Sequence, residues 1–367
     1  MSGVHAFTAA ALLLDALLAC VLLRKAPVTV PRLLRAGLWG LAFALFQATL
    51  VAQLLGRGFL GARLLHAFCF LAVPLACAAV AVRRRGGASA SARATAALLA
   101  LGTGGLFVWT SLIEPFALRL ERVDVPLPAA SAPSPPLRIG VLADLQCMSV
   151  GEFERQAVST LMAERPDLIL IPGDLEQVFT DADFTALLSP LHELLLQLDA
   201  PLGVYFVVGN CDWPDGTERL LAGTRIRPLL DETVRLQHGG RRIAVCGLRL
   251  MVEAQASRRA LRELEAATDD DVKIVFAHRP DAVLQLPADS RVDLVVAGHT
   301  HGGQIVLPGF GPPVTLSSVP REAAAGGLHE VDGTLLYVSR GIGVERGDAP
   351  RIRFNCPPEV TVLSLGR

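Results

Sequence analysis

The sequence is short of charged residues and carries almost no net charge. Asp, Glu, Lys and Arg make up 19% of its 367 residues, and 51% are hydrophobic. Soluble proteins usually carry about 25% charged residues, so part of this chain is expected to lie in lipid. The formal net charge of −1 provides no electrostatic basis for binding a polyanion. A nucleic-acid partner is therefore not expected.

The seven cysteines form no pattern typical of a zinc knuckle or a disulfide scaffold. No two of them are spaced as Cys-x-x-Cys. Cys20, Cys69 and Cys77 lie in apolar runs, where a thiol behaves as a small hydrophobic group. Neither class of small cysteine-stabilised protein is supported.

Long apolar runs occupy the first third of the chain. They cover residues 4–23, 36–55, 64–82 and 95–113, and each approaches the roughly 20 residues that cross a bilayer as a helix. We therefore predict a helical region of four transmembrane spans over residues 1–118. The alternative for the first run is a cleaved signal peptide, which the lack of a basic start and the three further spans disfavour.

Basic residues predict the orientation of these spans. They concentrate in the loops after the first and third runs, at Arg24, Lys25, Arg32, Arg35, Arg83, Arg84, Arg85 and Arg93. The loop after the second run has only Arg57 and Arg63. Because basic loops stay in the cytoplasm, the chain beyond the fourth span is predicted to be extracytoplasmic, although Arg119 and Arg122 oppose this.

A linker rich in Pro, Ala and Ser is predicted over residues 119–136, followed by a second domain over residues 137–367. Buried strands are predicted at 137–143, 167–171, 203–208, 243–246, 272–276 and 292–297, and helices at 151–164 and 181–198. Further strands are predicted at 304–307, 335–338 and 360–365. This order indicates a layered α/β architecture.

Polar residues follow the ends of five of these apolar strands. They are Asp144, Asp174, the group Asn210, Cys211 and Asp212, then His278, and finally His299 with His301. Each of them alone is more commonly a cap, turn or surface residue. Ligands of α/β sheets bind beyond the carboxyl ends of the strands, and oxygen donors mixed with imidazoles suit Mn, Fe, Zn or Co. Together they predict a metal site.

These residues carry a family resemblance. The order Asp144-x-Gln146, Gly173–Asp174, Gly209–Asn210–Cys211–Asp212, His278 and Gly298–His299–Thr300–His301 resembles the calcineurin-like metallophosphoesterases, whose pattern is D-x-H, G-D, G-N-H-[DE], H and G-H-x-H. The stretches HTHGGQIVLPG, SRGIG and RFNCPPE resemble the membrane-associated bacterial branch. The resemblance implies a four-layer α/β/β/α sandwich with two divalent metal ions, Mn, Fe or Zn, that hydrolyses a phosphodiester, pyrophosphate or phosphomonoester.

The resemblance also implies the role of each residue. Asp144, Asp174 and His301 would hold the first metal, and Asp174, Asn210, His278 and His299 the second, with Asp174 bridging the two ions. Gln146 stands where the family usually has a His ligand, and it can offer its carbonyl oxygen. Cys211 replaces a His that assists the transition state in many members, so we expect diesters or pyrophosphates with good leaving groups to be preferred.

Alternatives remain open at this stage. Arg340 is expected to pair either with phosphate or with an acidic side chain, and Asp212 to orient its loop. The leading hypothesis is an enzyme of the bacterial inner membrane that acts on a lipid-linked or envelope phosphate ester. Similar lipid A precursor pyrophosphatases face the cytoplasm, against the predicted orientation. The other candidates are a catalytically impaired metal-binding scaffold and a transport role for the spans, where Asp15 is the chief charge.

Overall fold

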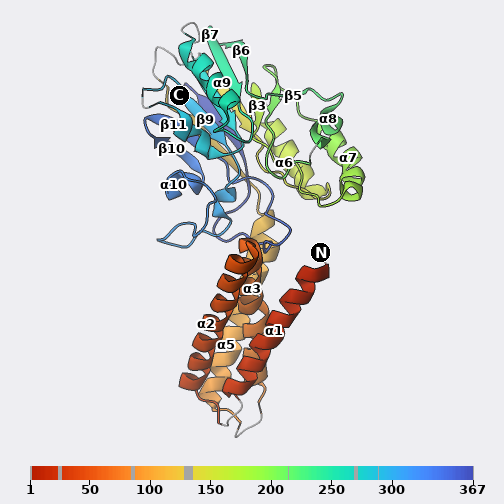
Figure 1. The fold of residues 1–367 in the computed structure, drawn as a ribbon, viewed down its shortest axis with the longest axis vertical. Helices are drawn as coiled ribbons and strands as arrows, with labels where there is room; N and C mark the ends of the chain where they lie inside the picture. Colours follow the sequence, from red (N-terminus) through yellow and green to blue (C-terminus); the bar gives the residue numbers. More distant parts are fainter. Residues whose placement is uncertain are drawn as a thin grey trace. The chain divides into compact units, whose positions relative to one another are not determined.

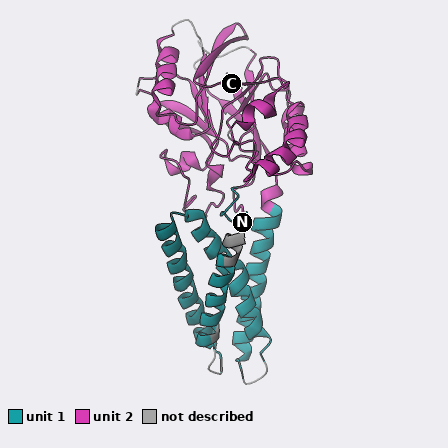
Figure 2. Ribbon diagram, turned by 45° about the vertical axis from the view of Figure 1, so that its right-hand side comes forward, with its two compact units in different colours: residues 1–113, 345–351 teal, residues 114–344, 352–367 magenta. Residues whose placement is uncertain are grey.

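The computed structural model describes residues 2–23, 27–83, 87–127, 135–213, 215–267, 272–287 and 289–366. They form two compact units (Figure 2). The helical unit comprises residues 1–113 and 345–351, and the α/β unit comprises residues 114–344 and 352–367. Of the predicted cytoplasmic loops, Arg24, Lys25, Arg84 and Arg85 lie outside the described residues.

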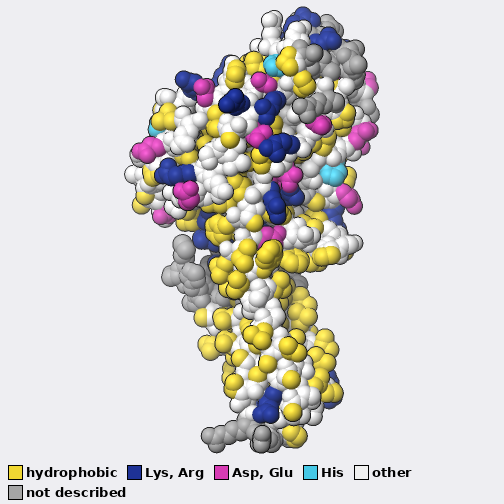
Figure 3. Space-filling model, turned by 180° about the vertical axis from the view of Figure 1, so that it is seen from behind, with side chains coloured by type: hydrophobic (Ala, Val, Ile, Leu, Met, Phe, Trp, Pro, Cys, Tyr) yellow, Lys and Arg dark blue, Asp and Glu magenta, His cyan; other side chains and the backbone are white. Residues whose placement is uncertain are grey.

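The helical unit exposes an apolar surface. Its elements are α1 (Ser2–Leu23), α2 (Val30–Leu55), α3 (Gly58–Ala67), the π-helical η1 (Phe68–Ala72), α4 (Val73–Ala81), α5 (Ala90–Val108) and the π-helical η2 (Trp109–Ile113). Hydrophobic side chains cover the face of this unit that Figure 3 presents, and Leu38, Leu54 and Leu101 are each more than half exposed. Such a surface suits a hydrocarbon environment.

Three stretches of this unit are long and apolar enough to cross a membrane. They are Val30–Leu55, Gly58–Ala81 and Ala90–Phe116. The first predicted span falls on α1 (Ser2–Leu23), whose apolar part among the described side chains is Phe7–Leu23. The structure thus shows three apolar helices of spanning length and one shorter apolar helix, and the four-span prediction is supported to that extent.

Each of the two π-helical segments lies next to a proline. Pro74 is the second residue of α4, which follows η1, and Pro115 is the second residue of η3 (Glu114–Phe116), which follows η2. Proline has no N–H to donate and crowds the preceding turn, and a wider π turn accommodates this without ending the helix. The chain therefore remains helical from Gly58 to Ala81.

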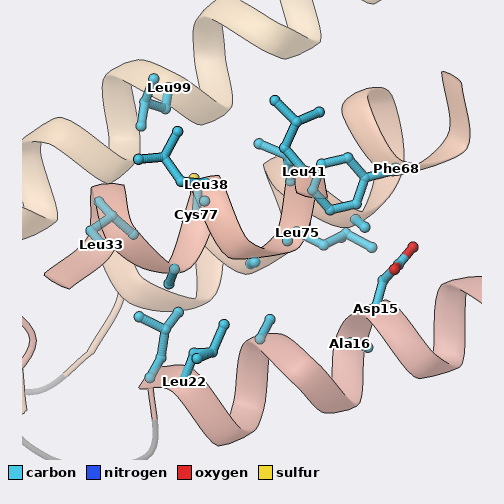
Figure 4. Close-up of a pocket in the computed structure, with 18 of the residues that line it drawn as sticks. Asp15, Ala16, Leu22, Leu33, Leu38, Leu41, Phe68, Leu75, Cys77 and Leu99 are labelled. Atoms are coloured by element: carbon cyan, nitrogen blue, oxygen red, sulfur yellow. The ribbon is translucent and has the colours of Figure 1, made fainter. Parts of the chain in front are cut away.

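An apolar cavity of about 700 Å³ lies within the helical unit (Figure 4). Its lining comes from α1, α2, α4, α5 and η1. Asp15 is the acidic residue of this lining, and its carboxylate accepts a hydrogen bond of 3.2 Å from Gln47. None of the polar residues at the strand ends lines this cavity.

The α/β unit contains two mixed sheets of six strands each (Figure 1). The first sheet has the order β1 (Arg119–Val125), β12 (Glu359–Leu365), β2 (Leu137–Val141), β3 (Leu168–Ile171), β4 (Val204–Phe206) and β5 (Ile226–Pro228). The second has the order β10 (Gly327–Val331), β11 (Thr334–Val338), β9 (Leu294–Ala297), β8 (Val272–Ala277), β7 (Arg241–Gly247) and β6 (Glu232–His238). Strands β2, β3 and β4 run parallel, as do β7, β8 and β9, so the carboxyl ends within each set meet at one edge.

Hydrophobic clusters hold this unit together. One joins the facing surfaces of the two sheets, with Ile139 and Leu170 from the first and Val245 and Phe276 from the second. Two others lie beneath helices on the outer surfaces. The helices are α6 (Glu152–Ala163), α7 (Asp181–Leu195), α8 (Gly216–Leu221), α9 (Gln255–Ala266), η4 (Pro280–Gln285) and α10 (Arg321–Ala324). The short 3₁₀ helix η5 (His301–Gly303) follows β9. Burial on both faces explains the uninterrupted apolar runs of β3 and β9.

The predicted strands fall on β2, β3, β4, β7, β8, β9, β11 and β12, and the predicted helices on α6 and α7. The strand predicted at 304–307 is wrong, because these residues make only isolated bridges within a loop. Residues 119–125, assigned to the linker, form β1 beside β12. Residues 128–134 of that linker lie outside the described residues.

Candidate metal centre

Two sheets deliver polar side chains to one place. Asp144, Asp174 and Asn210 follow β2, β3 and β4 of the first sheet, whereas His278 and His299 follow β8 and β9 of the second. Candidate ligand atoms of Asp144, Asp174 and His278 all lie within 4.8 Å of one another, and all three residues are buried.

The remaining predicted ligands surround this cluster. The Nε2 atom of His278 lies 3.5 Å from a carboxylate oxygen of Asp174 and 2.8 Å from the amide oxygen of Asn210. The Nδ1 atom of His299 lies 3.1 Å from the same Nε2 atom. His301 approaches from the side of Asp144, with 4.0 Å between its Nε2 atom and a carboxylate oxygen.

The hydrogen bond of His278 fixes which ring nitrogen faces the cluster. Its Nδ1 atom lies 2.8 Å from the carbonyl oxygen of Pro172. A carbonyl only accepts, so Nδ1 carries the proton and Nε2 presents a lone pair. That lone pair faces the amide oxygen of Asn210, and two such acceptors approach closely when a cation lies between them. The donor set therefore fits a transition-metal ion whose His ligand is held by a backbone carbonyl.

Burial keeps these imidazoles neutral. It lowers the pKa of His278 to about 4. Burial and then the neighbouring His278 lower the pKa of His299 to about 4. Burial also lowers the pKa of His301 well below its usual value. Neutral imidazoles are the form that binds metals.

Carboxyl groups crowd the same region. Burial, followed by the charge of Asp174, raises the pKa of Asp144 well above its usual value. Burial and the nearby Asp212 raise the pKa of Glu176 to about 8, and burial and Asp174 raise that of Asp212 to about 6. Such an accumulation of buried acids is costly unless cations neutralise it.

Asp212 orients the two loops that carry ligands. Its carboxylate accepts hydrogen bonds from the backbone N–H groups of Asp174 at 3.1 Å, Leu175 at 2.7 Å and Gly209 at 2.6 Å. The N–H of Cys211 in turn donates to the Asp174 carboxylate at 2.8 Å. Asp212 thus links the loop after β3 to the loop after β4.

Five site residues have left-handed backbone conformations. Positive φ angles occur at Asp144, Gln146, Asp174, His299 and His301, at 48°, 44°, 55°, 71° and 49°. This region is uncommon for residues other than glycine, and such strain clusters where function requires it. At these strand ends the strain coincides with the convergence of the polar side chains.

Gln146 and Cys211, the two residues that differ from the family pattern, contact each other. The amide nitrogen of Gln146 lies 3.1 Å from the sulfur of Cys211, and the amide nitrogen of Asn210 lies 3.2 Å from the same sulfur. The second contact turns the amide oxygen of Asn210 toward His278. Cys211 therefore helps to set the orientation of a predicted ligand.

Sequence reasoning missed the role of Arg353. Its side chain is fully buried and donates to the carbonyl oxygens of Arg340, Gly341, Gly343 and Cys356. This holds the segment 340–343, whose Gly343 N–H donates to the Asp144 carbonyl oxygen at 2.7 Å. In the sequence, the stretch RFNCPPE carries only a family resemblance. No local pattern indicates its contact with the segment beside Asp144.

Of the two kinds of partner expected for Arg340, phosphate and acidic side chains, the structure shows acidic side chains. Its guanidinium pairs with Glu359, which is buried, and with Glu121 at 2.8 Å. These partners join β11, β12 and β1 at one end. Arg340 is therefore committed to acidic side chains.

Known proteins resemble this chain over the region that contains the metal centre. A family model described as calcineurin-like phosphoesterase matches residues 137–303. Phosphodiesterase YaeI of Escherichia coli (strain K12) is 30% identical over 284 residues, which cover 74% of this chain and 97% of that protein. The uncharacterized metallophosphoesterase YkuE of Bacillus subtilis (strain 168) is 30% identical over 58% of this chain and 72% of its own. The UDP-2,3-diacylglucosamine pyrophosphatase LpxG of Chlamydia muridarum is 25% identical over 70% and 92% respectively.

Proposed function

Because the chain belongs to the calcineurin-like metallophosphoesterase family, and is thus a metal-dependent phosphoric ester hydrolase, we propose that it cleaves phosphodiesters or pyrophosphates of lipid-linked or envelope molecules. Relatives named as a phosphodiesterase and as a pyrophosphatase of a diacylated sugar nucleotide support these two bond types. The three apolar helices of spanning length support a substrate at the membrane.

The proposed ligands divide into two sets that share Asp174. Asp144, Asp174 and His301 would hold one ion, with Gln146 beside them, and Asn210, His278 and His299 would complete the other. Two divalent ions held there would supply Lewis-acid stabilisation of the phosphoryl oxygens and lower the pKa of a water molecule. The carbonyl of Pro172 keeps the Nε2 atom of His278 free of a proton, and Asp212 fixes the loop of the shared carboxylate.

The contact between Gln146 and Cys211 carries the preference for diesters and pyrophosphates. The family pattern places imidazoles at both positions, and an imidazolium can protonate a departing oxygen. The side chains present here are an amide and a thiol. A leaving group that departs without a proton, such as a phosphate or an acidic alcohol, depends least on that acid.

Substrates with good and poor leaving groups test this proposal. The purified full chain, loaded with Mn²⁺, Fe²⁺ or Zn²⁺ in turn, is assayed with bis-p-nitrophenyl phosphate, a p-nitrophenyl pyrophosphate ester and the alkyl monoester glycerol 2-phosphate. We expect kcat/KM for the diester to exceed that for the monoester by about tenfold or more, and the Asp174→Ala variant to cleave none of them. A clear preference for the monoester contradicts the proposal.

Metal content separates the enzyme from an impaired scaffold of the same fold. The proposed enzyme binds two transition-metal ions per chain and turns over substrate. A folded protein with one ion or none and no hydrolysis of any of the three esters would support the scaffold instead.

The α/β unit is proposed to lie outside the cytoplasm. Basic residues precede Val30–Leu55 and separate Gly58–Ala81 from Ala90–Phe116. If those segments are cytoplasmic, the third span leads out of the cytoplasm whether or not α1 crosses. An alkaline phosphatase fusion at the C-terminus should be active, and an inactive one with an active cytoplasmic reporter would reverse this orientation.

A further inference from the structure

A loop that follows the metal-site histidines exposes large apolar side chains. It covers residues 304–318 and is called the apolar loop below. Leu307, Phe310, Val314 and Leu316 are 40%, 57%, 58% and 52% exposed. Side chains of this kind gathered on one loop are unusual on a surface that faces only water.

The apolar loop is held in place at both ends. At its start, the N–H of Val306 donates to the carbonyl oxygen of Phe354 at 2.9 Å, and the N–H of Phe354 donates to Gln304 at 2.8 Å. At its end, the buried carboxylate of Asp281 accepts from the Ser317 hydroxyl and the Ser318 N–H, both at 2.9 Å. The exposed side chains are therefore displayed by a fixed backbone.

The tip of the loop is a hydrogen-bonded turn. The N–H groups of Gly311 and Leu307 each donate to the other residue's carbonyl oxygen, at 2.9 and 3.0 Å. This turn presents Phe310, over whose ring the guanidinium of Arg321 lies at 4.6 Å. An aromatic ring with an adjacent cation is typical of the boundary between lipid headgroups and acyl chains.

The end of the third apolar stretch belongs to the same unit as the loop. The third span, Ala90–Phe116, ends with three residues that belong to the α/β unit. One of them, Glu114, accepts a hydrogen bond of 2.6 Å from the N–H of Cys356. The thiol of Cys356 donates to the carbonyl oxygen of His301 at 3.3 Å. Within this one unit, two hydrogen bonds connect the end of the span to a proposed metal ligand.

The loop also lies next to the metal centre in the chain. It begins directly after η5, which starts at the proposed ligand His301, and its start is held by the hydrogen bond of Gln304 to Phe354. The same short segment therefore adjoins a proposed ligand and presents apolar groups outward.

We propose that the apolar loop inserts into the bilayer surface and there contacts the acyl chains of the lipids. The loop thereby brings a membrane-embedded phosphate ester to the metal centre. This inference rests on the proposed function and narrows its substrate class to esters that remain in the membrane during cleavage. The acyl chains contact Leu307, Phe310 and Val314, and Arg321 faces the lipid phosphates.

Fluorescence tests the insertion without any catalysis. The full chain carrying Phe310→Trp is reconstituted in phosphatidylcholine vesicles with plain or brominated acyl chains, and the emission of the wild type, which has three Trp residues, is subtracted. We expect bromine to quench the added emission. The matched control is Leu196→Trp, which is 51% exposed after α7, and it should not be quenched. Equal emission of the Phe310→Trp variant in both vesicles overturns the proposal.

Hydrolysis tests the consequence for the substrate. In a Leu307→Ser/Phe310→Ser/Val314→Ser variant, we expect the ratio of turnover of vesicle-embedded phosphatidyl-p-nitrophenol to that of soluble bis-p-nitrophenyl phosphate to fall about tenfold. Leu196→Ser should leave this ratio unchanged. An equal fall on both substrates overturns the proposed role of the loop. A wild type that cleaves neither ester contradicts the proposed function instead, and the fluorescence result still decides whether the loop inserts.

Discussion

Asp212 acts on the metal centre through the backbone. Its two carboxylate oxygens accept three N–H groups from the loops that carry Asp174 and Asn210. An amide in its place has one acceptor oxygen and turns an NH₂ group toward N–H donors. The position of both loops therefore depends on an ionised or hydrogen-bonding carboxyl group here.

We expect Asp212→Asn to weaken metal binding by about 10- to 100-fold, the range usual for groups that orient ligands. Titration of the metal-free protein with Zn²⁺ measures this. Asp199→Asn is a suitable control, because Asp199 makes an exposed ion pair with Arg225, and such pairs contribute little. Unchanged affinity in Asp212→Asn would show that the loops hold their positions without it.

A second prediction at this scale concerns Cys211. Substitution by His returns the imidazole of the family pattern beside the centre, where it can donate a proton to a poor leaving group. Cys211→His should raise the turnover of glycerol 2-phosphate, whose alkoxide must be protonated as it leaves, relative to that of bis-p-nitrophenyl phosphate by about tenfold, whereas Cys211→Ser should leave the ratio close to that of the wild type. Steady-state kinetics on both substrates measure this ratio. If Cys211→His leaves the ratio unchanged, the preference does not come from the loss of a general acid.

At the scale of elements, the segment that follows β11 packs against Asp144. Gly341 has a φ of +67°, and a Cβ atom added there would lie 2.7 Å from the Cβ of Asp144. Gly223 has a similar φ of +79° with no atom within 4 Å of the added Cβ. The two glycines share the same backbone requirement and differ in the close approach.

Substituting each glycine separately distinguishes the cost of the left-handed backbone from the cost of the close approach to Asp144. Gly223→Ala should lower the free energy of unfolding by about 1–2 kcal/mol, the cost of a left-handed alanine. Gly341→Ala should lower it further and also reduce bound metal, because Asp144 must shift. Thermal unfolding and metal analysis of both variants are the measurements. If the two variants behave alike, the approach to Asp144 has no consequence for the centre.

The apolar strands were predictable and the edge strands were not, for a physical reason. β3 and β9 are buried along their whole length, so their sequences are uninterrupted apolar runs. β1 and β6 read RLERVDV and ETVRLQH and alternate between exposed and half-buried residues at the sheet edges. Only pairing with β12 and β7 makes them strands, and no local pattern expresses this.

The candidate site was predictable in part for a related reason. Parallel strands bring their ends together, so the order of Asp144, Asp174 and Asn210 along the chain was sufficient to predict that they meet at one edge of the first sheet. That His278 joins them from the second sheet followed from the family resemblance alone. The contact between Gln146 and Cys211 and the burial of Arg353 depend on how separate loops pack. Such contacts leave no periodic signal in the sequence.

At the scale of the whole molecule, the buried carboxyl groups couple metal binding to stability. The pKa of Glu176 rises from 4.5 to about 8 and that of Asp212 from 3.8 to about 6. A carboxyl group whose pKa is higher in the folded than in the unfolded protein favours folding at low pH. That contribution is lost as the pH rises from the unfolded to the folded value.

The buried histidines, whose pKa values are lowered, cost stability only as the pH falls below about 6.5. Above that pH the raised pKa of Glu176 dominates, so the metal-free protein should lose stability between about pH 6.5 and 8. We expect the melting temperature after chelation to be several degrees lower at pH 8 than at pH 6.5. The Mn²⁺-loaded protein should change less, because the ions neutralise the same carboxylates. Differential scanning fluorimetry of both forms tests this, with Glu176→Gln as a variant that should flatten the metal-free curve. Parallel curves for the two forms would rule out the coupling.

The position of β12 has a consequence for how the protein is made. This last strand lies between β1 and β2 and pairs with both of them. The ribosome releases those two strands before β12, so until β12 emerges the nascent sheet keeps unpaired edges, a state prone to wrong pairing. A chain interrupted before Glu359 would leave β1 without its partner and the edge of β2 open.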